Sequence, residues 1–183
     1  MYTRPPSFLS EGPGEWVPHS TGEKGIGQTL KELRLLVGRS LLDPTTKAVA
    51  VGISKGVRPT DRAGYIRAVW DGVRRHMRYV PDTRGIEEVT SPAIHSRRIQ
   101  SDGQSWGDCD DFAALGAAWM LSLGVPARFN VLASRKNGGK FDHIRVEADD
   151  GKNWVPMETT IPRLALGESV PVLRNQIFDT LEV

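Results

Sequence analysis

Cys109 is the only cysteine of the 183-residue chain, and its neighbours favour a reactive sulfur. Asp108 is a good N-cap residue, and Asp111 can complete a capping box, so we expect a helix to begin at Cys109. A thiol at a helix N-terminus faces unpaired N–H groups and the positive end of the helix dipole. This position favours the thiolate and can hold an oxyanion, as a cysteine nucleophile requires.

His143 and Glu158 could activate such a nucleophile. Asp150-Gly151 is a strong signal for a two-residue hairpin turn, and a hairpin turning there places His143 directly opposite Glu158. Side chains in that relationship have Cβ atoms about 4.5–5.5 Å apart, so the carboxylate could orient the imidazole and stabilise its charged form. The same register pairs Ile144 with Met157 and Val146 with Val155 on one, apolar face, and puts His143 with Glu158 and Glu147 with Trp154 on the other. We therefore predict a cysteine–histidine–glutamate site.

Three aspartates around Cys109 act against the thiolate: Asp108, Asp110 and Asp111. At an effective dielectric near 20, one charge about 6 Å away is worth roughly 3 kcal/mol. The helix terminus contributes only about 0.3–1 kcal/mol in exposed settings. A nucleophilic Cys109 therefore requires a nearby imidazolium, and we assign that role to His143.

Other readings of the same residues stay open. The three aspartates could hold a hard cation, but their spacing matches no calcium loop, so we predict neither a metal nor a cofactor. Cys109 could be a small core residue, and His143 with Glu158 a surface pair. Gln104, just upstream, is a candidate donor to the oxyanion, although Gln104 and Trp106 could equally pack the loop.

The elements that must position these residues are helical first and extended afterwards. The periodicity predicts helices over 28–42, 44–54, 61–78 and 109–123, with strands over 128–134, 141–148 and 152–157. Residues 81–105 are expected to be loop with a short helical turn, and the fold of 163–183 stays unassigned. The helix from Cys109 is apolar on nearly every face, so we predict that it is central. The fold class is α+β.

Residues 1–27 are rich in proline and glycine and are predicted to form an extended arm before one domain of residues 28–183. The arm either binds a protein partner or packs on its own domain, with Phe8, Leu9, Trp16 and Val17 as anchors. A net charge of +2 carries no nucleic-acid signal. One cysteine excludes an intrachain disulfide, and no apolar run is long enough for a membrane span or a signal peptide. We expect a cytoplasmic protein.

Four stretches together resemble the transglutaminase-like superfamily: Gly107-Asp108-Cys109, Leu123–Arg128, Asp142–Glu147 and Trp154–Thr160. The likeness covers roughly residues 60–162 and is greatest to small members encoded by tailed phages and prophages. It implies a papain-like fold, a central helix packed on an antiparallel sheet, with Cys109, His143 and Glu158 as the catalytic residues. The family usually has aspartate at the acidic position, often an aromatic residue directly after the cysteine, and often Trp or Tyr two positions after the histidine. This chain has Glu158, Asp110 and Arg145 there.

Two functional hypotheses follow. In the first, the protein is a phage-associated cysteine acyl-transfer enzyme acting on a peptide or amide, a peptidase or amidase rather than a cross-linker. Cys109 attacks the carbonyl, His143 transfers the proton, Glu158 orients His143, and the Cys109 N–H with Gln104 holds the oxyanion. In the second, the protein is a virion component that keeps the fold as a scaffold and binds neighbouring subunits, other virion proteins among them, through residues 1–27. The location is the host cytoplasm or the virion.

Overall fold

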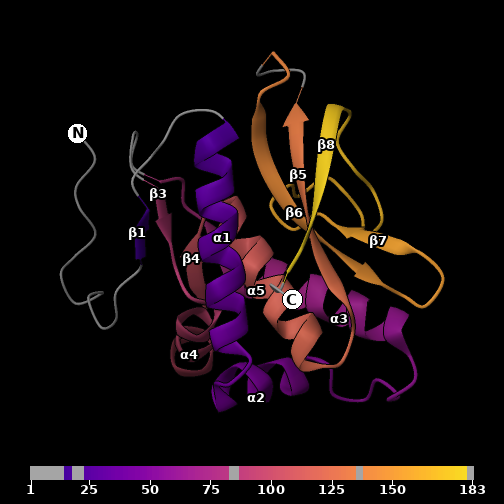
Figure 1. The fold of residues 1–183 in the computed structure, drawn as a ribbon. Coiled ribbons are helices and arrows are strands. Elements are labelled where there is room, and N and C mark those ends of the chain that lie inside the picture. The colour runs from indigo at the N-terminus through magenta and orange to yellow at the C-terminus, as the bar shows by residue number, and fades with distance from the viewer. Residues whose placement is uncertain (1–14, 18–22, 83–86, 135–137, 181–183) are drawn as a thin grey trace.

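A helical layer packs against an antiparallel sheet in the described part of the chain, residues 15–17, 23–82, 87–134 and 138–180 of a computed structural model (Figure 1). The helices are α1 (Glu23–Ser40), α2 (Pro44–Ile53), α3 (Arg62–His76), α4 (Pro92–Asp102) and α5 (Cys109–Ser122). The strands are β1 (Glu15–Val17), β2 (Met77–Tyr79), β3 (Glu87–Val89), β4 (Ser105–Gly107), β5 (Ala127–Ser134), β6 (Phe141–Asp149), β7 (Trp154–Met157) and β8 (Val172–Asp179). The predicted α+β class is confirmed.

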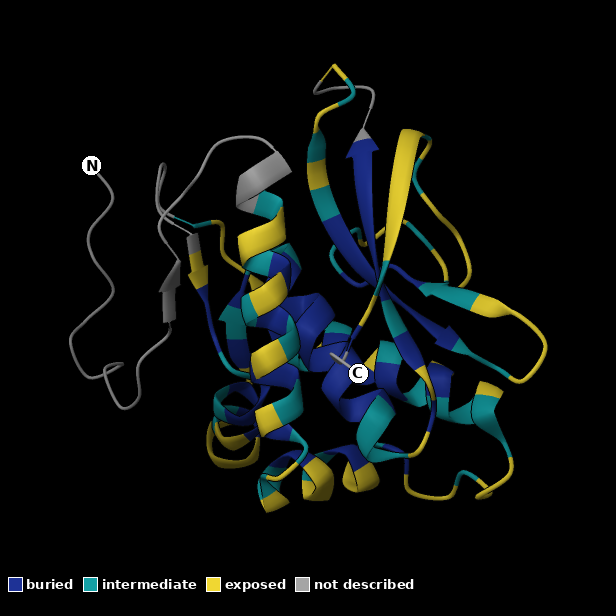
Figure 2. Ribbon diagram, viewed as in Figure 1, coloured by how far each residue is buried: buried dark blue, intermediate teal, exposed yellow. Residues whose placement is uncertain are grey.

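Helix α5 is the central element, and Figure 2 shows it in the buried colour between the other helices and the sheet. Every residue from Asp110 to Met120 is buried. The helix begins at Cys109 because Asp108 and Asp111 form the predicted capping box. It ends before Gly124, whose left-handed conformation (φ 74°) stops the chain from continuing the helix. The prediction of a central helix starting at the cysteine is therefore confirmed.

The main sheet has the strand order β7-β6-β5-β8, with antiparallel neighbours throughout. One face packs on α5, and buried side chains of β5 and β6 on that face include Phe129, Val131 and Val146. The edge strand β8 comes from the C-terminal segment whose fold the sequence had left open, and it pairs along nearly the whole of β5. Helix α5 thus has β6, the strand carrying His143, as a direct neighbour.

The hairpin between β6 and β7 does not have the predicted register. Asp149 pairs with Trp154 and Val146 with Met157, so four residues close the loop instead of two. The Asp150 carboxylate accepts hydrogen bonds from the N–H groups of Lys152 and Asn153, at 2.7 Å each, and this side chain stabilises the longer turn. The predicted directly opposite pairs, including His143 with Glu158, Ile144 with Met157, Val146 with Val155 and Glu147 with Trp154, were therefore wrong. The error is two residues, which keeps each side chain on its predicted face.

Helix α4 occupies much of the segment that was predicted to be loop. Its start carries clear signals: Ser91 caps the helix by accepting the N–H of Ala93, and Pro92 takes the first helical position. Gly103 ends it in the left-handed conformation (φ 76°). The weak apolar periodicity of this segment hid a helix that its capping residues could have revealed.

Part of the predicted N-terminal arm has regular structure. Strand β1 pairs antiparallel with β3, and α1 begins at Glu23, five residues earlier than predicted. Residues 1–14 and 18–22, including the proposed anchors Phe8 and Leu9, lie outside the described residues. The contact of β1 with β3 agrees with an arm that packs, at least there, on its own domain.

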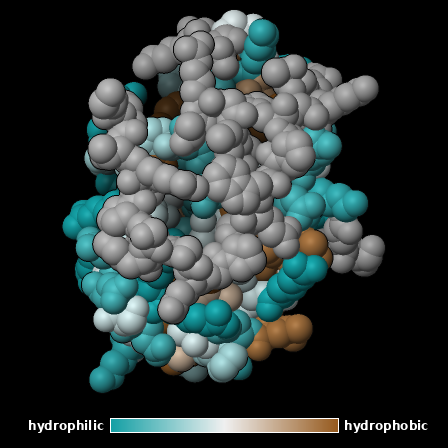
Figure 3. All heavy atoms as spheres, turned by 90° about the vertical axis from the view of Figure 1, so that its left-hand side faces the viewer, coloured by the Kyte–Doolittle hydropathy of each residue, from teal (hydrophilic) through white to brown (hydrophobic). Residues whose placement is uncertain are grey.

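Figure 3 shows the face of the molecule that lies on the left-hand side of Figure 1. The described residues visible on this face are mostly hydrophilic, and the hydrophobic ones are scattered among them. Such scattered apolar side chains are normal for a protein surface. None of the helices in the described ranges has both the length and the apolar character needed to cross a membrane.

Candidate active site

Cys109 is the first residue of α5 and is half-buried at the edge of the core. Asp108 accepts the N–H of Asp110 (3.2 Å), and Asp111 accepts the N–H of Asp108 (3.2 Å), so the cap holds the backbone on both sides of the cysteine. Tyr79, paired in register with Gly107, is exposed beside it. Partial burial raises the pKa of Tyr79 to about 12, and its acidic neighbours Asp108, Asp110 and Asp82, together with the Cys109 sulfur when it is ionised, act in the same direction. The sequence had not pointed to Tyr79 as a neighbour of the sulfur.

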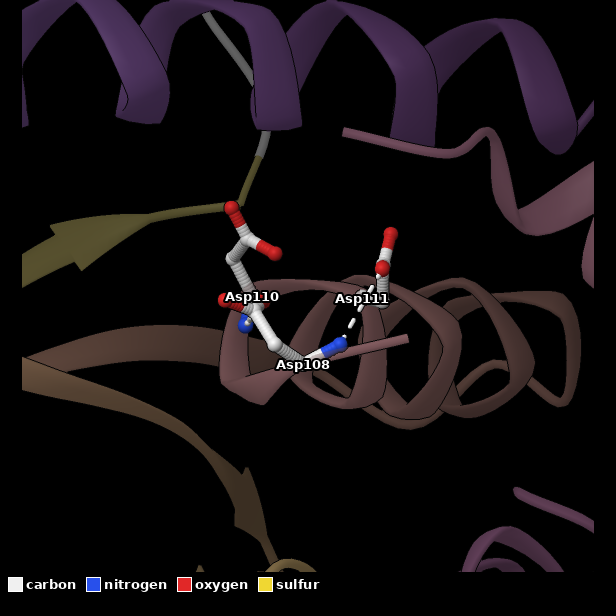
Figure 4. A group of neighbouring side chains, drawn as sticks. All are labelled: Asp108, Asp110 and Asp111. Atoms are coloured by element: carbon white, nitrogen blue, oxygen red, sulfur yellow. Dashed lines mark hydrogen bonds between the residues drawn. The ribbon is translucent and has the colours of Figure 1, made fainter. Parts of the chain in front are cut away.

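Asp108, Asp110 and Asp111 form the acidic group that Figure 4 shows at the first turn of α5. Oxygen atoms of the three carboxylates lie within 4.8 Å of one another, a spacing at which carboxylates can hold a cation. However, Asp108 and Asp111 use oxygens to accept backbone N–H groups of the cap. Helix capping therefore accounts for the positions of these two side chains.

His143 and Glu158 form a hydrogen bond, with 2.8 Å between Nε2 and Oε2. The Glu158 side chain is buried, and its second oxygen, Oε1, accepts both the N–H (3.1 Å) and the hydroxyl (2.8 Å) of Thr160. The indole of Trp70 donates to the Glu158 carbonyl at 2.8 Å. Both carboxylate oxygens thus have defined donors, and one of these donors is the imidazole.

The pKa of Glu158 lies below its ordinary value. Burial by itself raises this pKa, but the hydrogen bond and charge of His143, together with the Thr160 donors, outweigh the effect of burial. The carboxylate is therefore ionised at neutral pH although it is buried. An ionised, oriented carboxylate beside a histidine is the arrangement that stabilises an imidazolium.

Two contacts show how the chain direction of α5 relates to that of β6. Just beyond the C-terminal end of α5, the carbonyl of Pro126 accepts the N–H of Asp149 at 2.9 Å. Near the middle of α5, Gly116 faces Val146 so closely that an added Cβ would lie 3.2 Å from Val146 Cγ1. Going from Asp149 to Val146 along β6 therefore corresponds to going from the end of α5 towards its start.

This direction bears on where Cys109 lies relative to His143. From Gly116 back to Cys109 the helix covers about 10 Å, at 1.5 Å per residue. From Val146 back to His143 the strand also covers about 10 Å, at about 3.3 Å per residue. We therefore expect the sulfur and the imidazole to lie at the same end of the α5–β6 pair. Alternation along β6 puts His143 on the face of Arg145 and Glu147, so the imidazole has to reach the start of α5 around this end of the strand, where the β5–β6 register shifts between Leu132 and Ala133.

Arg145 stands where the transglutaminase-like pattern often has Trp or Tyr. Its side chain belongs to a polar network on the sheet face opposite α5. It donates to Glu147 (2.9 Å) and bonds Ser169. Glu147 also accepts from Arg128 (2.8 and 2.9 Å) and Asn130 (2.7 Å). Burial raises the pKa of Glu147, but these donors outweigh it and hold the pKa below its ordinary value. The network therefore holds β6 against β5 at Arg145 and Glu147, beginning two residues after His143.

Gln104, the side chain predicted to contact the oxyanion, is exposed at the residue before β4. The three residues of β4, about 10 Å of extended chain, separate Gln104 from Asp108. Trp106 packs against Arg98, whose guanidinium carbon lies 4.5 Å from the ring centre. The oxyanion role of Gln104 stays a prediction, whereas Trp106 has a packing partner.

Sequence reasoning missed several residues that hold the site. Thr160 was detectable, since Glu-x-Thr places a hydroxyl two residues from the carboxylate. Trp70 and Arg74 were not, because they act across the fold: Arg74 on α3 donates to the carbonyls of Leu164 (2.9 Å) and Pro162 (2.7 Å) beyond Glu158. Arg74 therefore ties α3 to the segment that follows Glu158.

A sequence profile of the transglutaminase-like superfamily matches residues 47–159, more than half of the chain. The chain belongs to the transglutaminase-like superfamily. The matched range contains Cys109, His143 and Glu158. No curated protein matches this superfamily member.

Two solved structures resemble this transglutaminase-like protein. One is a candidate protease from Parabacteroides distasonis ATCC 8503, with a TM-score of 0.53 and 11% identity over 72% of this chain. The other is a candidate cysteine protease from Cytophaga hutchinsonii, with a TM-score of 0.47 and 20% identity over 78% of this chain. The present chain spans 26% of the first protein and 51% of the second. At these identities the likeness concerns the fold alone.

Proposed function

We propose that this protein is a cysteine acyl-transfer enzyme that hydrolyses a peptide or amide bond with Cys109, His143 and Glu158. The observation that carries the proposal is the 2.8 Å hydrogen bond between His143 Nε2 and a buried Glu158 whose other oxygen is held by Thr160. A histidine ordered in this way, in a fold whose family places a cysteine at the start of the central helix, supports a nucleophile–base pair.

The proposed reaction begins with proton transfer from the Cys109 thiol to Nδ1 of His143, because Nε2 is bonded to Glu158. The thiolate forms a bond to the substrate carbonyl carbon, and the carbonyl π electrons move to oxygen. The imidazolium then gives its proton to the amine as the C–N bond breaks, leaving a thioester. Water attacks the thioester with His143 as base, and the acid and the thiol are released.

The N–H of Cys109, at the start of α5, is the proposed donor to the oxyanion. The positive end of the α5 dipole acts on the same charge. The Gln104 side chain is the second candidate carried over from the sequence. We favour hydrolysis over cross-linking because the structural neighbour with a TM-score of 0.53 carries the name of a candidate protease. A peptide or amide substrate follows from this choice, and association with a phage or virion stays a prediction of the sequence resemblance.

The test is the pH profile of Cys109 alkylation by iodoacetamide, followed by mass spectrometry, for the wild type and His143→Ala. We expect an apparent pKa below the free-thiol value of about 8.5 in the wild type. His143→Ala should raise it and slow the reaction, because the imidazolium is lost. His76→Ala is the matched control, since His76 bonds the Gly103 carbonyl outside the site.

Superimposable profiles for the wild type and His143→Ala, with an apparent pKa at or above the free-thiol value, would end the enzyme proposal. That result would favour the alternative, a virion structural or assembly component that keeps this fold as a scaffold and binds its neighbours through residues 1–27. Hydrolysis of a peptide substrate that disappears in Cys109→Ser would support the enzyme.

A further inference from the structure

A buried histidine outside the proposed triad lies directly behind the first turn of α5. His95, on α4, is fully buried. Its Nδ1 lies 2.8 Å from the hydroxyl of Ser105 on β4, and its Nε2 lies 3.2 Å from Oδ1 of Asp111 on α5. One imidazole therefore connects α4, β4 and the helix that begins with Cys109.

Asp111 receives donors from three separate segments. Its Oδ1 accepts the N–H of Thr90 (2.8 Å) as well as the contact from His95, and its Oδ2 accepts the N–H of Asp108 (3.2 Å). The Asp111 side chain is 3% exposed, so few of its bonds can be replaced by water. Gly107 leaves the space for it, because a Cβ there would lie only 2.0 Å from Oδ2.

These bonds imply one arrangement of protons. The Asp111 carboxylate accepts at both oxygens, so the ring nitrogen facing it, Nε2, must carry the hydrogen. Nδ1 then accepts from the hydroxyl of Ser105 when the ring is neutral. The imidazole thus donates a hydrogen bond to Asp111, which belongs to the capping box of α5 and lies two positions after Cys109.

We propose that His95 is a positioning residue for Cys109, a role that rests on the proposed function of Cys109 as nucleophile. By holding Asp111 through Nε2–H, His95 fixes the rotation and position of the first turn of α5. Asp111 in turn holds the N–H of Asp108, the residue before the cysteine. The sulfur and the adjacent backbone N–H groups are thereby kept in place relative to β6. Small displacements of a reacting group are costly, so this support should be measurable in the reactivity of Cys109.

The two amide variants of His95 separate this role from general packing. Gln places its side-chain nitrogen close to the position of Nε2 and can still donate to Asp111, whereas Asn reaches only the position of Nδ1 and Ser105. Both variants leave a polar, uncharged side chain in the same buried place. His95→Gln should therefore keep the positioning contact that His95→Asn loses.

Ser96→Ala is the matched control on the same helix. Ser96 is also fully buried and accepts the indole N–H of Trp119 at 3.0 Å. This bond likewise joins α4 to α5, but Trp119 lies about 15 Å along α5 from Cys109. Removing it should weaken the packing of α4 on α5 without moving the first turn.

The experiment measures the iodoacetamide alkylation rate of Cys109 in the full chain, together with thermal stability, for the wild type and the three variants. We expect His95→Asn to lower the rate about tenfold or more, while His95→Gln and Ser96→Ala stay within about threefold of the wild type. The positioning role would be overturned if His95→Asn and Ser96→Ala were alkylated at equal rates, or if the alkylation rates of the variants simply followed their thermal stabilities. The wild type and His143→Ala, run beside them, report separately on the proposed function.

A measurement on the wild type covers the case in which the buried amides prevent folding. In ¹⁵N-histidine-labelled protein the ring nitrogens of His95 can be assigned by NMR, and we expect the hydrogen on Nε2. A His95 ring that carries its hydrogen on Nδ1 alone would contradict donation to Asp111 and overturn the proposal.

Discussion

Glu158 bonds His143 diagonally across the sheet rather than from the directly opposite position. In the observed register Val146 pairs with Met157, so one step further Glu158 falls beside Arg145, two residues from His143. Diagonal neighbours lie about 7–8 Å apart at the backbone, which long side chains can span. The 2.8 Å hydrogen bond therefore depends on the length of glutamate. This geometry gives a reason for glutamate where aspartate is usual in the family.

We first predict that Glu158→Asp impairs the site although aspartate is the usual residue in the family. The side chain is shorter by one methylene and should no longer reach His143 across the diagonal. The alkylation rate of Cys109 should fall about tenfold, close to the effect of Glu158→Gln, which keeps the length and loses the charge. Alkylation of Glu158→Asp at the wild-type rate would show that the hydrogen bond does not need the longer chain.

A second prediction concerns Thr160, whose hydroxyl donates to Glu158 Oε1. Thr160→Val keeps the shape and removes this donor, which should cost about 1 kcal/mol of unfolding free energy and raise the pKa of Glu158. Chemical denaturation and the pH profile of alkylation measure the two effects. Thr159→Val serves as the control: it makes the same change one residue earlier, whereas the donors to the two oxygens of Glu158 are Thr160 and His143. Equal losses in both valine variants would contradict a specific role for Thr160.

Third, stability should fall in acid. The pKa values of Glu158 and Glu147 are below the ordinary value of 4.5, since their donors outweigh burial. Both carboxylates therefore stabilise the folded state above about pH 4.5, and this contribution is lost as the pH falls through their folded-state pKa values. The melting temperature of the wild type should drop steeply there. Glu147→Gln should start less stable at neutral pH and show a shallower drop; an unchanged slope would argue against this network as a cause.

Fourth, Gly107→Ala should disrupt the start of α5. A Cβ at this residue would lie 2.0 Å from the Asp111 carboxylate, so the cap has to move. We expect a loss of about 2 kcal/mol or more, combining overpacking with a weakened cap, and slower alkylation of Cys109. Gly52→Ala on α2 is the matched control: a Cβ there meets nothing within 4 Å, and alanine should stabilise the helix by about 0.5–1 kcal/mol. Similar effects of the two alanines in denaturation experiments would refute this account of Gly107.

What the sequence determined by itself was local. The capping box of Asp108 and Asp111, the all-apolar helix behind Cys109 and the glycine that ends it were readable, because these signals lie within a few residues of one another. The two faces of the hairpin were readable as well, since an error of two residues leaves each side chain on its face. This is why Cys109, His143 and Glu158 were found as candidates.

Only the tertiary structure decided how these residues meet. The register of β6 and β7 depends on the Asp150 side chain closing a four-residue turn, which a two-residue turn signal does not distinguish. The contact of His95 with Asp111 brings α4 to the start of α5, and no periodicity or motif encodes that approach. Contacts between separate elements follow from the packing of whole faces, so a pattern in one stretch of chain cannot specify them.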